Sequence, residues 1–147
     1  MEICRVTEVW QAALVYEVRI KAFVEKQNIP IHLEFDEIYG EKYHYVLLYE
    51  GTQGIGTARI NFSEKEYAKI ERVAITPEHQ QHGLGRQLIA AAEEWIREAG
   101  YQKIVITSQT QAAGFYEKLG YRIRTDIHLE SDIPIVYTEK NIGKVRS

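Results

Sequence analysis

The chain has 147 residues, a length that predicts one domain, residues 1–147, around a single core. A net charge of -3 gives no basic footprint for nucleic acid, and no apolar run approaches a membrane span. The single cysteine, Cys4, rules out an internal disulfide, and the start at Met1 lacks a signal-peptide pattern. We therefore expect a cytoplasmic protein with neither membrane nor nucleic-acid partners.

The first half of the chain predicts one strand, one helix and then three more strands. Residues 2–7 have the pattern of a short strand, and apolar residues recur at helical spacing over residues 9–26 until Pro30 blocks continuation. Residues 31–41 mix acidic and apolar side chains, which favours a loop with at most one helical turn. Polar turns then separate three segments rich in aromatic and β-branched residues, an antiparallel meander. These strands are expected at residues 43–49, 55–62 and 67–76.

The second half contains the clearest helix of the sequence. From Leu84 to Ala99 the apolar residues form one stripe, and Gly100 suits the left-handed end of a helix. A strand, a short helix and two strands are then expected at residues 103–107, 111–119, 121–125 and 133–138. The order β-α-β-β-β-α-β-α-β-β predicts an α+β fold, a mixed sheet flanked by helices.

The segment from Val73 to Arg86 runs from a strand through a glycine-bearing loop into that long helix. Unpaired N–H groups and the macrodipole at a helix start favour an anion, and glycines let the backbone approach it closely. A P-loop would need Gly-Lys-Ser/Thr where this chain has Gly85-Arg86-Gln87, and a Rossmann fingerprint would need a third glycine. A phosphate or pyrophosphate site and a tight turn whose glycines serve only packing both remain open.

Two motifs now carry a resemblance. Gln80-x-x-Gly83-x-Gly85 resembles the Q/R-x-x-G-x-G/A acetyl-CoA signature of the GNAT N-acetyltransferase superfamily. Ala112-x-x-Phe115-Tyr116-Glu117-Lys118-Leu119-Gly120-Tyr121 is similar to the family's A-x-x-F-Y-x-K-x-G-F segment. The first helix, from Val18 to Pro30, resembles a branch of small stand-alone bacterial members called YjcF-like, and the likeness spans essentially the whole chain.

The resemblance implies an α/β/α-layered GNAT fold with a mixed, mostly antiparallel sheet that splays into a V between its fourth and fifth strands. Acetyl-CoA lies in that V, with fourth-strand backbone on the acetyl carbonyl and pantetheine, and loop N–H groups on the pyrophosphate. The cofactor-binding residues implied are Val73, Ala74, Ile75, Gln80, Gln81, His82, Gly83, Leu84, Gly85, Arg86, Gln109, Ala112, Phe115 and Tyr116.

The implied activity is transfer of the acetyl group of acetyl-CoA to a primary amine, by direct attack in a ternary complex. The acceptor is expected to be a small molecule; a protein or peptide amine, or a non-catalytic acyl-CoA-binding module, are the alternatives. Homodimers are common in the family, which leaves a homodimer open, but no interface can be read from the residues.

The chemistry assigns roles to three residues. A backbone N–H of Val73 can stabilise the carbonyl oxygen as it gains charge, and the Tyr116 phenol can protonate the departing thiolate. The alternative for Tyr116 is an aromatic packing residue, and its position within the matched motif favours the acid role. Glu71 is the candidate base because strand alternation gives it the face of Val73 and Ile75, unless it only pairs with a neighbouring cation.

The acceptor site is less legible. Glu34, Asp36 and Glu37 form an acidic cluster that either attracts a cationic amine or is simply a solvated loop. Arg59 and Asn61 alternate to one face of the third strand and are candidate acceptor contacts. We expect no metal, since His79 and His82 have no third ligand at metal spacing. Near the last strand the YjcF-like branch tends to read Ile-Pro-His where this chain has Ile133-Pro134-Ile135, which points to a different acceptor or base.

Overall fold

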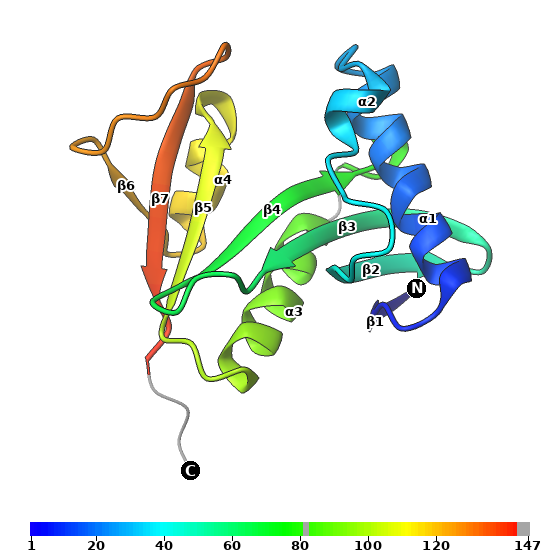
Figure 1. The fold of residues 1–147 in the computed structure, drawn as a ribbon, viewed down its shortest axis with the longest axis horizontal. Helices are drawn as coiled ribbons and strands as arrows, with labels where there is room; N and C mark the ends of the chain where they lie inside the picture. The colour runs from blue at the N-terminus through cyan, green and yellow to red at the C-terminus, as the bar shows by residue number, and fades with distance from the viewer. Residues whose placement is uncertain (81–82, 144–147) are drawn as a thin grey trace. The chain divides into compact units, whose positions relative to one another are not determined.

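The computed structural model describes residues 1–80 and 83–143 (Figure 1). Its elements, in chain order, are β1 (Glu2–Arg5), α1 (Val9–Arg19), the π-helical η1 (Ile20–Glu25), α2 (Ile31–Glu34), β2 (His44–Glu50), β3 (Gln53–Asn61), β4 (Ala68–Ile75), the 3-10 turn η2 (Pro77–His79), α3 (Leu84–Glu98), β5 (Lys103–Gln109), the 3-10 turn η3 (Thr110–Ala112), α4 (Ala113–Lys118), β6 (Arg122–Arg124) and β7 (Ile135–Asn141).

The strands form one seven-stranded mixed sheet in the order β1-β2-β3-β4-β5-β7-β6. Antiparallel pairing joins β1 to β2, β2 to β3, β5 to β7 and β6 to β7. β4 and β5 run parallel, with Ala68 opposite Ile104 and Lys69 opposite Val105. A mixed, mostly antiparallel sheet with helices between its strands is the fold class predicted from the sequence, and that prediction is confirmed.

The chain divides into two compact units, one of Met1–Ile60 with Arg72–Ala92 and one of Asn61–Glu71 with Glu93–Ser147. Neither unit is a continuous segment, because the chain passes between them within β4, within α3 and at the end of β3. The assignment of residues 1–147 to one domain stays a prediction.

In the first unit, β3 is shaped by a bulge and by two glycines. Ile55 is an extra residue of β3, since the register against β2 shifts between Leu48 and Tyr49. A Cβ at Gly54 would lie 2.9 Å from a methyl group of Val18 on α1, whereas one at Gly56 would lie 3.7 Å from Leu88 on α3. The bulge therefore turns two glycines of equal parity to opposite faces, where helices pack closely against the strand.

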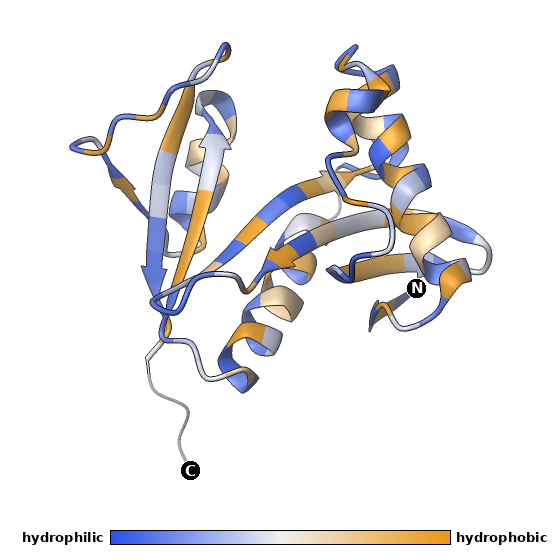
Figure 2. Ribbon diagram, viewed as in Figure 1, coloured by the Kyte–Doolittle hydropathy of each residue, from blue (hydrophilic) through white to orange (hydrophobic). Residues whose placement is uncertain are grey.

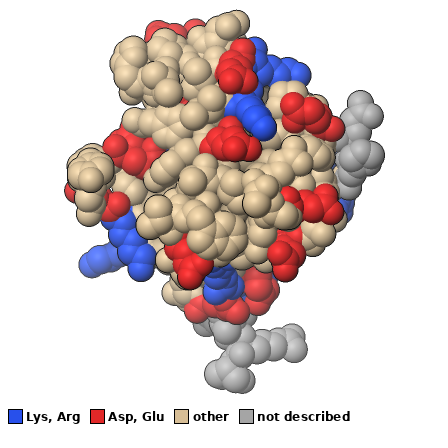
Figure 3. Space-filling view, turned by 90° about the vertical axis from the view of Figure 1, so that its right-hand side faces the viewer, with Lys and Arg blue, Asp and Glu red and all other residues tan. Residues whose placement is uncertain are grey.

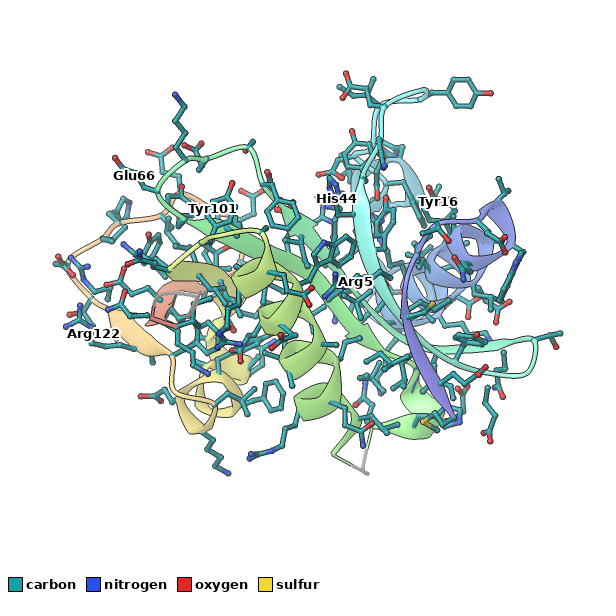
Figure 4. The ribbon with its side chains drawn as sticks, turned by 90° about the horizontal axis from the view of Figure 1, so that it is seen from below. Arg5, Tyr16, His44, Glu66, Tyr101 and Arg122 are labelled. Atoms are coloured by element: carbon teal, nitrogen blue, oxygen red, sulfur yellow. The ribbon has the colours of Figure 1, made fainter. Side chains whose placement is uncertain are left out.

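In the second unit, the end of α3 is fastened to the loop before β4. The Tyr101 hydroxyl, which follows α3, donates to the carbonyl oxygens of Phe62 at 3.1 Å and Glu64 at 2.9 Å (Figure 4). Hydrophobic and hydrophilic residues alternate around the turns of α3 (Figure 2), as the predicted apolar stripe requires.

Two predicted helices differ from the observed ones. The helix expected over residues 9–26 is α1 followed directly by six π-helical residues, with the Lys26 amide donating to the Lys21 carbonyl. The helix expected over residues 111–119 begins as a 3-10 turn and becomes α-helical only at Ala113. An apolar stripe marks which side of a helix is buried, but it does not distinguish 3-10, α and π hydrogen bonding. Within the described ranges, none of the helices has the length and apolar character to cross a bilayer.

Candidate active site

The start of α3 has the geometry of an anion site. Gly83 adopts a left-handed φ of 68°, and its carbonyl accepts the first helical bond, from the Gln87 amide at 3.3 Å. The N–H groups of Leu84, Gly85 and Arg86 therefore precede the first helical donor, Gln87, and point out of the helix end. Among the residues that the structure describes, a Cβ on Gly83 would meet no atom within 4 Å, which leaves room for a ligand beside the backbone. The residues at this helix start fit a diphosphate.

Hydrogen bonds hold residues 75–80, which precede α3. The Thr76 amide donates to the Ile55 carbonyl at 2.8 Å, and the Thr76 hydroxyl lies 2.8 Å from His79 Nδ1. Gln80 donates its side-chain N–H to the Ile75 carbonyl at 3.3 Å. His79 and Gln80 thus hold residues 75–80 in place. The implied cofactor residues Gln81 and His82 lie outside the described residues.

β4 contains a backbone feature that could not be predicted from the sequence. Arg72 has a φ of 54°, a left-handed conformation in the middle of a strand. Beyond it, Ala74 is buried against Val18 and Ala22, so Val73 and Ile75 take the opposite face. Because strand alternation does not carry through a left-handed residue, the argument that gave Glu71 the face of Val73 and Ile75 loses its basis. The role of Glu71 stays a prediction.

Tyr116, on α4, is a buried phenol. Only 7% of it is exposed, and burial raises the pKa of its hydroxyl to about 12. Its ring packs edge-on against Phe115 at 5.1 Å and against Tyr121 at 6.0 Å. The phenol is protonated at neutral pH, as it would be even at its ordinary pKa, so it holds a proton to donate, and it is also a packing residue.

The C-terminal end of α4 is held by an ion pair and by hydrogen bonds. The Tyr121 hydroxyl donates to Glu93 at 2.7 Å, and Lys140 Nζ lies 3.1 Å from the same carboxylate. Lys140 also donates to the Leu119 carbonyl at 2.7 Å, at the end of α4. These bonds fix the helix that carries Tyr116.

The remaining residues implied for the cofactor lie around the end of β5. Gln109 is opposite Ile135 on β7, and its side-chain oxygen accepts a hydrogen bond from Gln111. Ala112 ends the 3-10 turn before α4, and the Phe115 side chain is exposed. Ile135, where the family branch has histidine, is thus the cross-strand neighbour of a residue implied for the cofactor.

Three arginines and three carboxylates of the first unit form what we call the arginine–carboxylate cluster. Its members are Arg19, Arg59, Arg72, Glu34, Asp36 and Glu37. Arg19 is fully buried, with its Nε 2.9 Å from the Glu34 carboxylate and its Nη2 2.8 Å from the Glu34 carbonyl. Arg59 binds Asp36 at 2.6 Å and Glu37 at 3.2 Å. The formal charges of the cluster cancel, so it is not the acidic patch expected from the sequence.

The pKa values within the cluster reflect this pairing. Hydrogen bonding from Arg59 lowers the pKa of Asp36 to about 2. Burial raises the pKa of Glu34, and the pull of Arg19 and Arg72 reduces that rise without cancelling it. Burial lowers the pKa of Arg19, but the carboxylates of Glu37 and Glu34 outweigh it, so the net shift is upward.

The four residues predicted for the acceptor differ in exposure and in their hydrogen-bond partners. Glu34 and Arg59 are both buried in ion pairs, whereas the Asp36 side chain is 48% exposed. Asn61, at the end of β3, accepts a hydrogen bond from the Ser63 amide at 2.8 Å and caps a turn there. Of the four, Asp36 alone combines a fixed charge with an exposed side chain.

On the face drawn in Figure 3, basic and acidic side chains lie in small mixed groups among other residues. Across residues 1–80 and 83–143, no three His, Cys, Asp or Glu side chains are grouped as metal ligands would be.

Sequence reasoning missed Arg19 and Arg72. A signal for Arg19 existed, because it lies one residue after buried Val18 and four after buried Val15 on the inner side of α1. A charged residue at such a position predicts a buried partner. Arg72 gave no comparable signal, since arginine has no preference for left-handed backbone.

Comparisons with solved structures identify the class to which this fold belongs. A crystal structure of a protein from Lactobacillus plantarum superposes with a TM-score of 0.88 at 30% identity, covering 96% of this chain and 97% of that one. N-acetylglutamate synthase from Neisseria gonorrhoeae, solved with coenzyme A and N-acetyl-glutamate, shares the fold with a TM-score of 0.71 at 15% identity, over 98% of this chain and 36% of that one. The fold is that of the acyl-CoA N-acyltransferases.

Sequence comparison adds the family. Residues 8–121 match the model of the acetyltransferase (GNAT) family. YjcF of Bacillus subtilis, an uncharacterized N-acetyltransferase, is 32% identical over 81% of this chain and 84% of its own length. The chain belongs to the GNAT family, as its two motifs predicted, and it is an N-acetyltransferase that uses acetyl-CoA.

Proposed function

We propose that this enzyme acetylates the primary amine of a small molecule. The observation that carries the acyl-CoA half of this proposal is the start of α3, where Gly83 opens the backbone beside three outward N–H groups. When bound there, acetyl-CoA supplies an acetyl group as a thioester. Leu84, Gly85 and Arg86 would hold the pyrophosphate through their amides, with the Arg86 side chain adding charge.

The residues of the chain divide the work of the reaction. The amine nitrogen forms a bond to the acetyl carbon while the bond from that carbon to sulfur breaks. The Val73 N–H donates to the oxygen that gains charge, and the Tyr116 hydroxyl gives its proton to the departing sulfur. The proton lost by the amine goes to Glu71 or to water, and the Tyr116 phenolate regains a proton from solvent, so the products are an N-acetyl amine and a free thiol.

Asp36 is the favoured contact for the acceptor. Its pKa of about 2 keeps it ionised throughout the working range, and its side chain is half exposed. Arg59 and Arg72 compensate the charge of Asp36, so the cluster offers one amine a hydrogen-bond acceptor on an exposed carboxylate rather than a broad acidic surface. This arrangement favours a small amine over a long basic peptide.

The catalytic role of Tyr116 is tested by comparing two Tyr→Phe variants. Tyr116→Phe removes the proposed proton donor but keeps the ring packing, so kcat should fall by about 100-fold with little change in coenzyme A affinity. The matched control is Tyr101→Phe, which loses a hydroxyl that only fastens a turn and should keep wild-type kcat. Equal kcat in wild type and Tyr116→Phe would exclude the proton-donor role.

The acceptor class is tested by release of free thiol with two panels. One panel holds mono- and diamines of low molecular weight, and the other holds peptides with free N-termini or lysines. We expect turnover with the small amines, and we expect Asp36→Asn to raise the KM for the amine. Turnover with peptides alone would replace the small-molecule proposal with the peptide one.

A further inference from the structure

The backbone of Arg72 is strained, with a left-handed φ of 54°. Of the residues that the structure describes, only Asn28 and Arg72 combine a side chain with a left-handed φ, and asparagine tolerates that conformation far better than arginine. Asn28 lies in a loop, whereas Arg72 lies within β4. A strained residue inside a strand persists only where its surroundings hold it.

Those surroundings are the segment around α2. Arg72 Nε lies 3.3 Å from the Glu34 carbonyl and 3.4 Å from its carboxylate, and Nη2 lies 3.3 Å from Asp36. Glu34 is in turn bound by the fully buried Arg19. The guanidinium of Arg72 is therefore tied to a support that is itself fixed in the core.

A left-handed residue in a strand redirects the residues that follow it. Val73 comes next, and Ala74 is fixed against Val18 and Ala22. The direction of the Val73 N–H is thus set between two fixed points, the guanidinium contacts before it and the packed methyl group after it.

We propose that Arg72 is a positioning residue for acetyl transfer, which holds the left-handed turn that aims the Val73 N–H through its bonds to Glu34 and Asp36. The inference rests on the proposed role of Val73 in the reaction. It adds that the side chain of Arg72 couples the segment around α2 to β4.

Two substitutions separate the backbone effect from general damage. Arg72→Ala and Arg72→Gly lose the same contacts, but glycine takes a positive φ without strain. With the best amine of the panel, Arg72→Ala should lower kcat by about 100-fold and Arg72→Gly by about tenfold, because loss of an aligned oxyanion donor has effects of that order. Affinity for coenzyme A, measured by calorimetry, should stay within about twofold in both, since the pyrophosphate amides are untouched.

The control is Arg122→Ala, whose side chain is exposed and whose partner Glu139 keeps Lys103 and Arg124. It should behave as wild type. Wild-type kcat in Arg72→Ala, equal losses in the alanine and glycine variants, or loss of coenzyme A affinity in parallel with kcat would each overturn the proposal.

A second measurement does not depend on turnover. Amide hydrogen exchange at Leu33 and Glu34, which donate to the Pro30 carbonyl, should accelerate by at least about fivefold in both Arg72 variants and not in Arg122→Ala. If no amine is acetylated by the wild type, the proposed function fails while this coupling is still tested. Unchanged exchange in both Arg72 variants would refute the coupling itself.

Discussion

Replacing Arg19 by methionine should destabilise the protein strongly. The substitution keeps the bulk of the side chain but removes a fully buried cation that bonds Glu34 at 2.9 Å and 2.8 Å and Glu37 at 3.1 Å. Glu34, 3% exposed, would keep its ion pair with Arg72 at 3.4 Å. Breaking a buried pair from one side costs about 3–5 kcal/mol, which for a chain of this size lowers Tm by roughly 10 °C.

The assay is urea unfolding of four proteins at pH 7.5. Arg19→Met should lose about 4 kcal/mol, and adding Glu34→Gln should recover about 1–3 kcal/mol because the stranded charge is gone. Arg122→Met, an exposed arginine on β6, should stay within about 0.5 kcal/mol of wild type.

The same variant should respond to pH with a defined sign. Burial already raises the pKa of Glu34 above its unfolded value, and loss of Arg19 raises it further. A raised carboxyl pKa means that the folded state binds the proton more tightly, so the deficit of Arg19→Met should shrink as pH falls from 7.5 towards 4.5. Wild-type stability in Arg19→Met, or no recovery in the double variant, would refute this account of the cluster.

The remaining predictions concern a glycine and an acid-sensitive carboxylate. Gly83→Ala places a methyl group in open space but at a φ of 68°, so the free energy of unfolding should fall by about 1 kcal/mol in chemical denaturation. Gly114→Ala on α4 also meets open space and should raise the free energy of unfolding by about 0.5 kcal/mol. Equal effects of the two substitutions would contradict the left-handed geometry of Gly83. Hydrogen bonds from Lys103 and Arg124 lower the pKa of Glu139 to about 2, so the stability it contributes is present above about pH 4.3 and is lost as pH falls towards 2. Glu139→Gln should therefore flatten the acid limb of a stability–pH profile, and an unchanged limb would exclude Glu139 as a contributor.

Much of the fold followed from local patterns in the sequence. The stripe from Leu84 to Ala99 predicted α3, and turn residues between β-branched runs predicted β2, β3 and β4. The glycine before α3 was predictable too, because Gly83 takes a left-handed φ that glycine adopts without strain, whereas the pyrophosphate role of this loop stays a prediction.

The arginine–carboxylate cluster was not predictable, because its partners come from α1, β3, β4 and the segment around α2. Sequence shows acidic residues at 34, 36 and 37 but not which cations meet them, so an apparent acidic patch became a neutral one. The left-handed Arg72 follows from tertiary contacts alone, and it undid the alternation argument for Glu71.

Binding of a diphosphate at the start of α3, beside Gly83, is the basis of the proposed function. Calorimetric titration of the wild-type protein with coenzyme A tests it directly, with acetyl-CoA as the second ligand. We predict saturable binding of one molecule per chain to both. A folded protein, verified by a cooperative unfolding transition, that shows no heat and no change in Tm with either ligand would contradict the account.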